Sequence, residues 1–248
     1  MSGHSKWKNI MHKKGAADAR RGKIFSKLIK ELSVAVKTGG GPDPDANPRL
    51  RAAVQNARAQ NMPKDTVERA IKKAAGVGGD DYQEIAYEAF GPNGVAFFID
   101  CATDNKVRTI GNIRSYFNKY GGNMGKDGCL QFLFLRKGIF TIENLEIDED
   151  QFTLEMIDAG AEDVQNEDGI FTVTTAMDDF GSVQKKLQDL NITPQESGLQ
   201  RICTETKKLD EEAFMKFMKL LEVLEDDDDV QKVYHNVEFD EELLNKMG

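Results

Sequence analysis

Residues 138–174 read GIFTIENLEIDEDQFTLEMIDAGAEDVQNEDGIFTVT. The spacing of apolar residues in this stretch predicts strand 138–142, helix 150–159, strand 161–165, a turn at Asp168-Gly169 and strand 170–174. A helix over 179–190 and a strand around 199–204 follow. The order βαββαβ is that of a ferredoxin-like module, so we expect residues 135–204 to form one α+β domain.

The segments on either side of this module each hold part of a second sheet. Before it, the pattern predicts strands 85–90 and 95–101, joined by a hairpin turn at residues 91–94, then helix 106–119 and a strand at 129–134. After it come helix 210–224, an acidic turn and strand 230–239. Joined, residues 82–134 and 205–240 complete one discontinuous α+β domain with the module inserted. Three domains in linear order are the alternative.

The acidic turn Glu225–Asp229 is too short and irregular for a calcium-binding loop. We expect it to be solvated.

Residues 1–78 are expected to form a basic helical domain. Its first long helix is amphipathic, with apolar residues at helical spacing: Ile24, Phe25, Leu28, Ile29 and Leu32. The glycines at 39–41 end that helix; a phosphate cradle made by their N–H groups is the less favoured interpretation. The second helix begins near Pro48 with Asn47 as N-cap, and residues 61–63 end it. In the third helix we expect Val67, Ala70 and Ile71 to point inward. The cations of the same helix, Lys64, Arg69, Lys72 and Lys73, should point outward. Taken together, the fold class is α+β with three domains.

Positive and negative charges are distributed unevenly along the chain. Residues 1–75 hold 17 Lys and Arg against 6 Asp and Glu, a net charge of +11, whereas the remainder holds 16 against 36, a net charge of −20. Such asymmetry is typical of a segment that binds nucleic acid. The acidic remainder would also limit non-specific coating of other polyanions.

Composition argues against a membrane or secreted protein. The longest purely apolar run, Val95 to Ile99, is far too short to span a bilayer, and no apolar stretch follows the charged start as in a secretory signal. Three widely spaced cysteines without a CxxC motif fit reduced thiols. We therefore expect a cytoplasmic protein without a membrane partner.

No pattern for catalysis stands out. The sequence has no phosphate-binding loop, no dinucleotide fingerprint and no cluster of His and Cys with metal-ligand spacing. Asp18 and Glu31 are the only acidic residues among the first 42, which disfavours a two-metal nuclease site beside the basic segment. We expect no enzyme activity, no cofactor, no metal and no small-molecule substrate.

The N-terminal cations are the candidate contacts for phosphate, because Lys and Arg that neutralise phosphates release counterions and supply most non-specific affinity. Trp7 lies between two of them; stacking on an unpaired base and filling the helical core are equally favoured roles. The candidate nucleic-acid-binding residues are Lys6, Trp7, Lys8, His12, Lys13, Lys14, Arg20, Arg21, Lys23, Lys27, Lys30, Arg49, Arg51, Arg58 and Lys64.

Four segments together resemble the YebC/PmpR family. They are GHSKWKNIMHKKGAADARRGKIFSKLIKEL (3–32), GGGPDPDANPRLRAAVQNARAQNMPKDTVERAIKKAAG (39–76), YEAFGPNGVAFFIDCATDNKVRT (87–109) and NKYGGNMGKDGC (118–129). The resemblance implies a helical first domain, two α+β domains and a role in gene expression. Bacterial members are labelled probable transcriptional regulatory proteins. Other members resemble translation factors, including a mitochondrial translational activator.

Several functions remain open at this point. The expected function is a DNA-binding transcriptional regulator that uses the basic N-terminal helices. The main alternative is a translation factor or translational activator that binds RNA or the ribosome. An enzyme such as a nuclease, and an adaptor that binds proteins through its acidic domains, are further alternatives.

Overall fold

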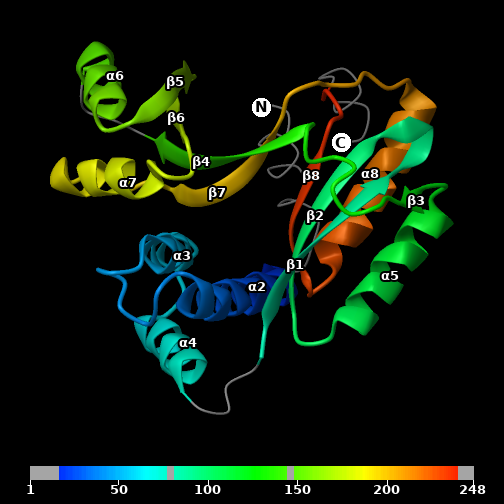
Figure 1. Cartoon of the computed structure of the whole chain (residues 1–248), viewed down its shortest axis with the longest axis horizontal. Coiled ribbons are helices and arrows are strands. Elements are labelled where there is room, and N and C mark those ends of the chain that lie inside the picture. The colour runs from blue at the N-terminus through cyan, green and yellow to red at the C-terminus, as the bar shows by residue number, and fades with distance from the viewer. Residues whose placement is uncertain (1–16, 77–80, 144–147, 240–248) are drawn as a thin grey trace. The chain divides into compact units, whose positions relative to one another are not determined.

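The computed structural model describes residues 17–76, 81–143 and 148–239, and it divides into two compact units. Of the described residues, one unit contains 17–27, 81–135 and 203–239, and the other contains 28–76, 136–143 and 148–202. Figure 1 shows the helices and strands of both. The predicted α+β class is confirmed.

The inserted module has the predicted ferredoxin-like topology. Its elements are β4 (Phe134–Glu143), α6 (Glu149–Asp158), β5 (Ala161–Glu167), β6 (Ile170–Thr175), α7 (Phe180–Asp189) and β7 (Glu196–Cys203). The sheet order is β5-β6-β4-β7, and β6 runs antiparallel to both of its neighbours. Asp168 and Gly169 both have positive φ, at 52° and 83°, as the tight turn between β5 and β6 requires.

Aromatic pairs fill the core of this module. Phe140 on β4 stacks on Phe180 on α7 with ring centroids 4.7 Å apart. Phe152 on α6 meets Phe171 on β6 edge to face at 5.3 Å. The same core includes Ala52 from the N-terminal helices. Packing against the sheet therefore fixes α6 and α7. The N-terminal helix that carries Ala52 packs against the same core, although it lies far away in the sequence.

The described N-terminal region contains three helices: α2 (Ala17–Thr38), α3 (Pro48–Ala59) and α4 (Lys64–Ala75). The glycines after Thr38 end α2, since Gly40 and Gly41 have φ of 106° and 114°. Asn47 is buried and caps α3, as predicted: its side chain accepts a hydrogen bond from Leu50 N and donates to the Ala35 and Gly41 carbonyls. One amide thus joins the end of α2 to the start of α3.

The second sheet forms from two distant parts of the chain. Its elements are β1 (Gln83–Phe90), the short 3₁₀ turn η1 (Pro92–Gly94), β2 (Ala96–Thr103), α5 (Lys106–Lys119), β3 (Asn123–Met124), α8 (Glu211–Asp226) and β8 (Val230–His235). The order is β3-β1-β2-β8, antiparallel throughout. Because β8 follows the ferredoxin-like module and pairs with β2, the module is inserted. The exact domain bounds proposed from the sequence stay a prediction.

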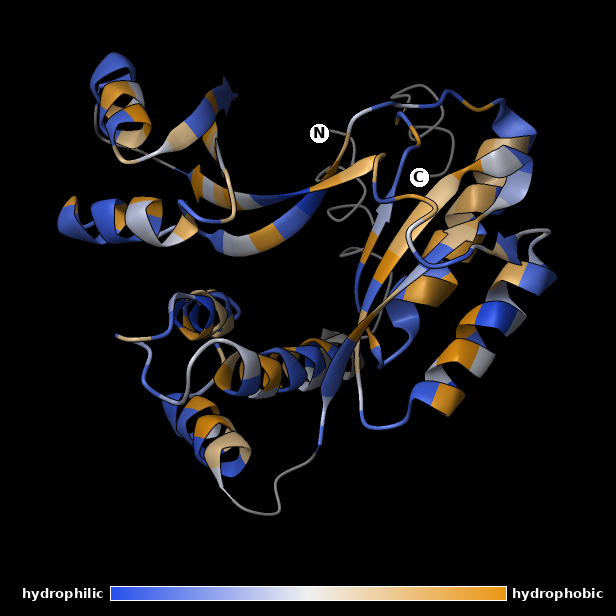
Figure 2. Ribbon diagram, in the orientation of Figure 1, coloured by the Kyte–Doolittle hydropathy of each residue, from blue (hydrophilic) through white to orange (hydrophobic). Residues whose placement is uncertain are grey.

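Helices α5 and α8 contribute to the core on one face of this sheet. Phe97 on β2 contacts Phe117 on α5 edge to face at 5.3 Å and Phe217 on α8 at 5.7 Å. Figure 2 shows hydrophobic residues gathered along β2 and much of α8. These contacts belong to one continuous cluster of buried apolar side chains.

The predicted strand at 129–134 is wrong. Residues 127–133 form consecutive turns, and strand β4 begins only at Phe134. Leu130, Leu133 and Phe134 pack against Ala96 and Phe98, on the other face of the sheet from α5 and α8. Their spacing of three and four residues suits a turn that covers a sheet, whereas a strand would alternate its side chains between two faces.

Glu88 anchors these turns. Its buried carboxylate accepts hydrogen bonds from the backbone N–H groups of Gly128 and Leu130, and its carbonyl accepts one from Gly125 N at 2.7 Å. A buried carboxylate is stable only when its oxygens are hydrogen-bonded, and here the turns supply the donors. The segment is therefore held to β1 by polar as well as apolar contacts.

Candidate nucleic-acid interface

The predicted contact residues fall into three groups. Six of them, Lys6 to Lys14, lie outside the described residues, and so does the side chain of Arg20. Lys23, Lys27, Lys30, Arg49 and Arg51 are part of the packed structure. Arg21, Arg58 and Lys64 are exposed. The described cations therefore divide into those that are buried or have partners within the chain and those that face solvent.

Two lysines of α2 face the C-terminal end of α8. The ammonium of Lys23 forms an ion pair with the carboxylate of Asp226, and that of Lys27 donates to the Glu225 carbonyl at 2.7 Å. Burial lowers the pKa of Lys27, while the nearby carboxylates of residues 225–228 act in the opposite direction. By contrast, the guanidinium of Arg21 lies over the Phe25 ring, 5.3 Å from its centroid, and is exposed.

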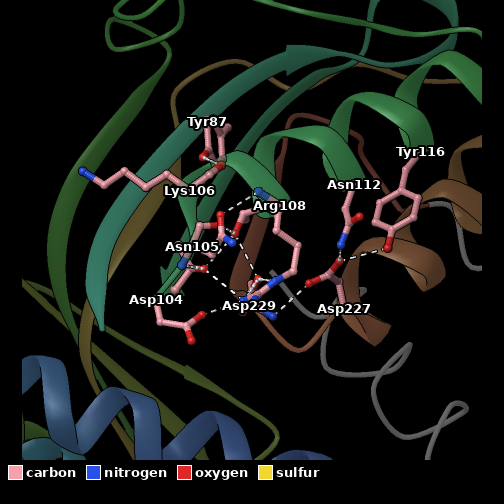
Figure 3. Close-up of polar contacts among 11 residues, drawn as sticks. Tyr87, Asp104, Asn105, Lys106, Arg108, Asn112, Tyr116, Asp227 and Asp229 are labelled. Atoms are coloured by element: carbon pink, nitrogen blue, oxygen red, sulfur yellow. Dashed lines mark hydrogen bonds and ion pairs between the residues drawn. The ribbon is translucent and has the colours of Figure 1, made fainter. Parts of the chain in front are cut away.

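The acidic turn 225–229, expected to be solvated, is engaged by α5 at Asp227 and Asp229 (Figure 3), while Asp226 and Asp228 are exposed. Asp229 is 3% exposed and accepts hydrogen bonds from the Arg108 guanidinium at 2.7 Å and the Thr109 hydroxyl at 2.9 Å. Asp227 accepts one from the Tyr116 hydroxyl at 2.9 Å. Burial, together with this hydrogen bond, raises the pKa of Tyr116 to about 12. Two of the turn's carboxylates are thus held in place.

Sequence reasoning missed this network for a physical reason. Arg108 and Thr109 lie in the first turn of α5, after the N-cap Asn105, whereas Asp229 follows α8 more than a hundred residues later. No local spacing links the two segments. A buried carboxylate paired with a partly exposed arginine becomes visible only when β8 has been placed beside β2.

Two arginines of α3 have partners within their own unit. The Arg51 guanidinium donates to the carbonyls of Pro44 and Asp45 and to Gln184 Oε1 on α7. Arg49 donates to the Thr38 hydroxyl at 3.0 Å. Lys30 on α2 is 9% exposed. The hydrogen bonds of Arg49 and Arg51 stabilise the arrangement of the helices, and a phosphate contact by either arginine would compete with them.

Helix α3 is attached to the ferredoxin-like module by a buried amide. Asn56 donates to the Ser197 carbonyl at 2.8 Å and accepts from Ser197 N–H at 2.9 Å. Since β7 lies at the edge of its sheet, its backbone groups there would otherwise lack partners. The buried amide therefore anchors α3 to the sheet, while the other side of the helix pair α3–α4 stays exposed to solvent.

The exposed cations of that pair are Arg58, Lys64, Arg69, Lys72 and Lys73, and α4 also exposes Asp65 and Glu68 among them. We call the set Arg58, Lys64, Arg69 and Lys72 the cationic face. Arg58 lies near the end of α3 and Lys64 begins α4, with a turn at Asn61 (φ 56°) between them. Val67 and Ala70 turn inward, which leaves Arg69 and Lys72 on the outer side of α4. Lys64 lies 3.6 Å from Glu68 in a highly exposed pair, the weakest kind of ion pair.

Among the described residues, no group of three or more His, Cys, Asp or Glu is arranged to hold a metal ion. The three cysteines are free thiols; Cys101 is buried, and burial raises its pKa. Within the same described ranges, no helix combines the length and apolar character needed to cross a bilayer.

Two family models match nearly the whole chain. One describes the TACO1/YebC N-terminal domain and covers residues 5–77; the other describes the second and third domains and covers residues 82–237. The chain belongs to the TACO1/YebC family. The resemblance seen in the sequence motifs is thereby confirmed.

Individual members of the TACO1/YebC family are similar over their full length. A probable transcriptional regulatory protein of Hathewaya histolytica is 51% identical over 97% of this chain and 98% of its own. Another of Desulforapulum autotrophicum is 48% identical over the full length of both chains. A crystal structure of a conserved hypothetical protein from Aquifex aeolicus, 41% identical, superposes with a TM-score of 0.81 over 92% of this chain and 95% of that one. The names of the first two relatives describe them as probable transcriptional regulators.

Proposed function

We propose that this protein is a cytoplasmic regulator of gene expression that binds nucleic acid through its N-terminal helices. The observation that carries the proposal is the cationic face: Arg58, Lys64, Arg69 and Lys72 are exposed on two adjoining helices that are anchored by buried contacts. Cations carried on anchored helices suit a polyanion, because little backbone order must be created on binding. The names of the relatives agree with this role.

Transcription is the first candidate process, with duplex DNA as the partner. A second candidate is translation, with structured RNA or the ribosome as the partner. Arg and Lys contact the phosphates of both polymers, so the cationic face is compatible with either process and the binding experiment below distinguishes them. We propose no catalytic role, cofactor or small-molecule substrate for either process.

The test uses charge reversal on the cationic face. The variant R58E/K64E/K72E changes three exposed side chains, so the fold should persist. Binding to a labelled DNA duplex and to an RNA hairpin of matched length is measured by fluorescence anisotropy over a range of salt. We expect affinity to fall on the order of a hundredfold, and the log–log salt slope to shrink by about 1 for each lost phosphate contact.

A matched control reverses three exposed lysines elsewhere, in K126E/K185E/K219E. Its net charge is the same, so it reports the effect of overall charge alone. Equal losses in the two variants, or unchanged binding in the first, would rule out the cationic face as the contact surface. The ratio of RNA to DNA affinity in the wild type decides between the two processes.

A further inference from the structure

The contact between α2 and the acidic turn joins opposite charges far apart in the sequence. Lys23 and Lys27 are one helical turn apart on α2, so both side chains lie on the same face. Lys23 pairs with the Asp226 carboxylate and also lies 3.4 Å from the Asp226 carbonyl oxygen, while Lys27 donates to the Glu225 carbonyl. Both lysines are therefore bound to the last residues of α8.

The C-terminal end of α8 carries an unfavourable concentration of negative charge. The C-terminus of a helix carries the negative end of its dipole, which cations stabilise and anions destabilise. Helix α8 has no basic residue in its last turn, yet five consecutive acidic residues begin there at Glu225. The positive charge comes instead from Lys23 and Lys27. The end of α8 at Glu225 and Asp226 therefore depends on α2 for charges that the helix itself does not supply, whereas Asp229 pairs with Arg108 of α5.

The turn is also held by contacts that do not involve α2. Asp229 is held by Arg108 and Thr109, and Asp227 by Tyr116. Asp226 is left on the outside, with 66% of its side chain exposed, and it pairs with Lys23. A carboxylate and aligned backbone carbonyls held in this way present negative charge to α2, as the phosphates of a nucleic-acid backbone would.

We propose that the acidic turn 225–229 is an intramolecular competitor of nucleic acid, occupying Lys23 and Lys27 until phosphates displace it. This inference rests on the proposed function. An exposed ion pair is weak, so a phosphate can replace Asp226 as the partner of Lys23. The acidic turn therefore does not block nucleic-acid binding permanently. Lys27, being more buried, follows when Lys23 has been released. The competitor raises selectivity, because only a dense polyanion can replace both contacts.

The decisive variant is D226N, which removes the charge of an exposed residue and keeps its shape. We expect D226N to bind the same labelled DNA or RNA about threefold to tenfold more tightly than the wild type at low salt. D127N is the charge-matched control, since Asp127 is exposed on a different loop of the same unit. It should bind as the wild type does, within about twofold.

The dependence on Lys23 separates competition from general repulsion. In K23Q, the cation that Asp226 occupies is absent, so adding D226N should give no further gain. A gain in D127N equal to that in D226N, or a gain that persists in K23Q/D226N, would overturn the competitor. A wild type that binds neither DNA nor RNA would instead overturn the proposed function. Thermal unfolding of all variants verifies that differences in affinity do not arise from unfolding.

Discussion

The side-chain amide of Asn56 exchanges two hydrogen bonds with the backbone of Ser197, one donated at 2.8 Å and one accepted at 2.9 Å. An amide reproduces the donor and acceptor of a neighbouring strand at this one position. Both residues are buried, so no water replaces the partner if it is lost. The contact ties helix α3 to the edge of the ferredoxin-like sheet.

Replacing Asn56 by alanine should lower stability markedly. N56A leaves the N–H and C=O of Ser197 without partners, and we expect a loss of about 2–4 kcal/mol in the free energy of unfolding. Chemical denaturation measures the loss. Q60A, which truncates an exposed amide just after the same helix, is the control and should change stability by less than about 0.5 kcal/mol. Similar values for the two would show that the exchange contributes little.

Gly39 should not tolerate a side chain. A Cβ at this position would lie 2.2 Å from Asn47 Oδ1 and 2.8 Å from the Ala35 carbonyl oxygen. We therefore expect G39A to displace the cap of α3 and to cost about 2–4 kcal/mol in thermal or denaturant unfolding. G22A places the same methyl group on exposed α2, where nothing lies within 4 Å. It should instead stabilise by about 0.5–1 kcal/mol, and a stabilising G39A would contradict the structure.

Tyr116 should make stability depend on pH in the alkaline range. Its pKa in the folded chain is raised to about 12, from the usual 10.0 of a free tyrosine. A raised pKa means that the folded state holds the proton more tightly. The stabilising contribution is therefore complete below about pH 10 and is lost as pH rises toward 12.

The comparison with Y116F isolates this contribution. The stability advantage of the wild type over Y116F should be constant up to about pH 10 and should decline above it. Alkaline absorbance titration should also show one late-titrating phenol that Y116F lacks. An advantage that grows between pH 10 and 12 would refute the assignment to Tyr116.

Glu88 should control access to Cys129. Burial and the nearby Glu88 carboxylate raise the pKa of the Cys129 thiol. E88Q removes the charge and weakens the hold on Gly128 and Leu130, so thiol labelling at Cys129 should accelerate severalfold at neutral pH. Mass spectrometry distinguishes the cysteines, with the buried Cys101 as an internal reference. Equal acceleration at both would indicate general unfolding and not a local release.

Local patterns predicted most of the architecture. The ferredoxin-like module emerged from strand and helix periodicities within 70 residues, and the turn at Asp168-Gly169 from residue types that adopt positive φ. The segment 129–134 was misassigned because a short apolar run fits a strand and a covering turn equally well. The segment forms a turn if a nearby face of the sheet is left uncovered by helices. A short stretch of sequence does not contain that information.

The candidate interface was predicted less completely. Charge counting located the basic segment but did not distinguish Lys23 and Lys27, which pair with residues about 200 positions away, from Arg58 and Lys64 on the surface. Arg51 likewise has a partner on α7. A cation's role depends on what folds against it, and long-range partners leave no signature in its own neighbourhood.

The pairing of β2 with β8 has a consequence for biosynthesis. Strand β2 leaves the ribosome early, but its partner is among the last segments to be made, after the whole ferredoxin-like module. Until then one edge of a strongly apolar strand lacks hydrogen-bond partners, which invites pairing with other chains. A nascent chain that stalls or is cleaved after Cys203 should therefore aggregate, and chaperones would be needed most between the completion of β2 and the arrival of β8.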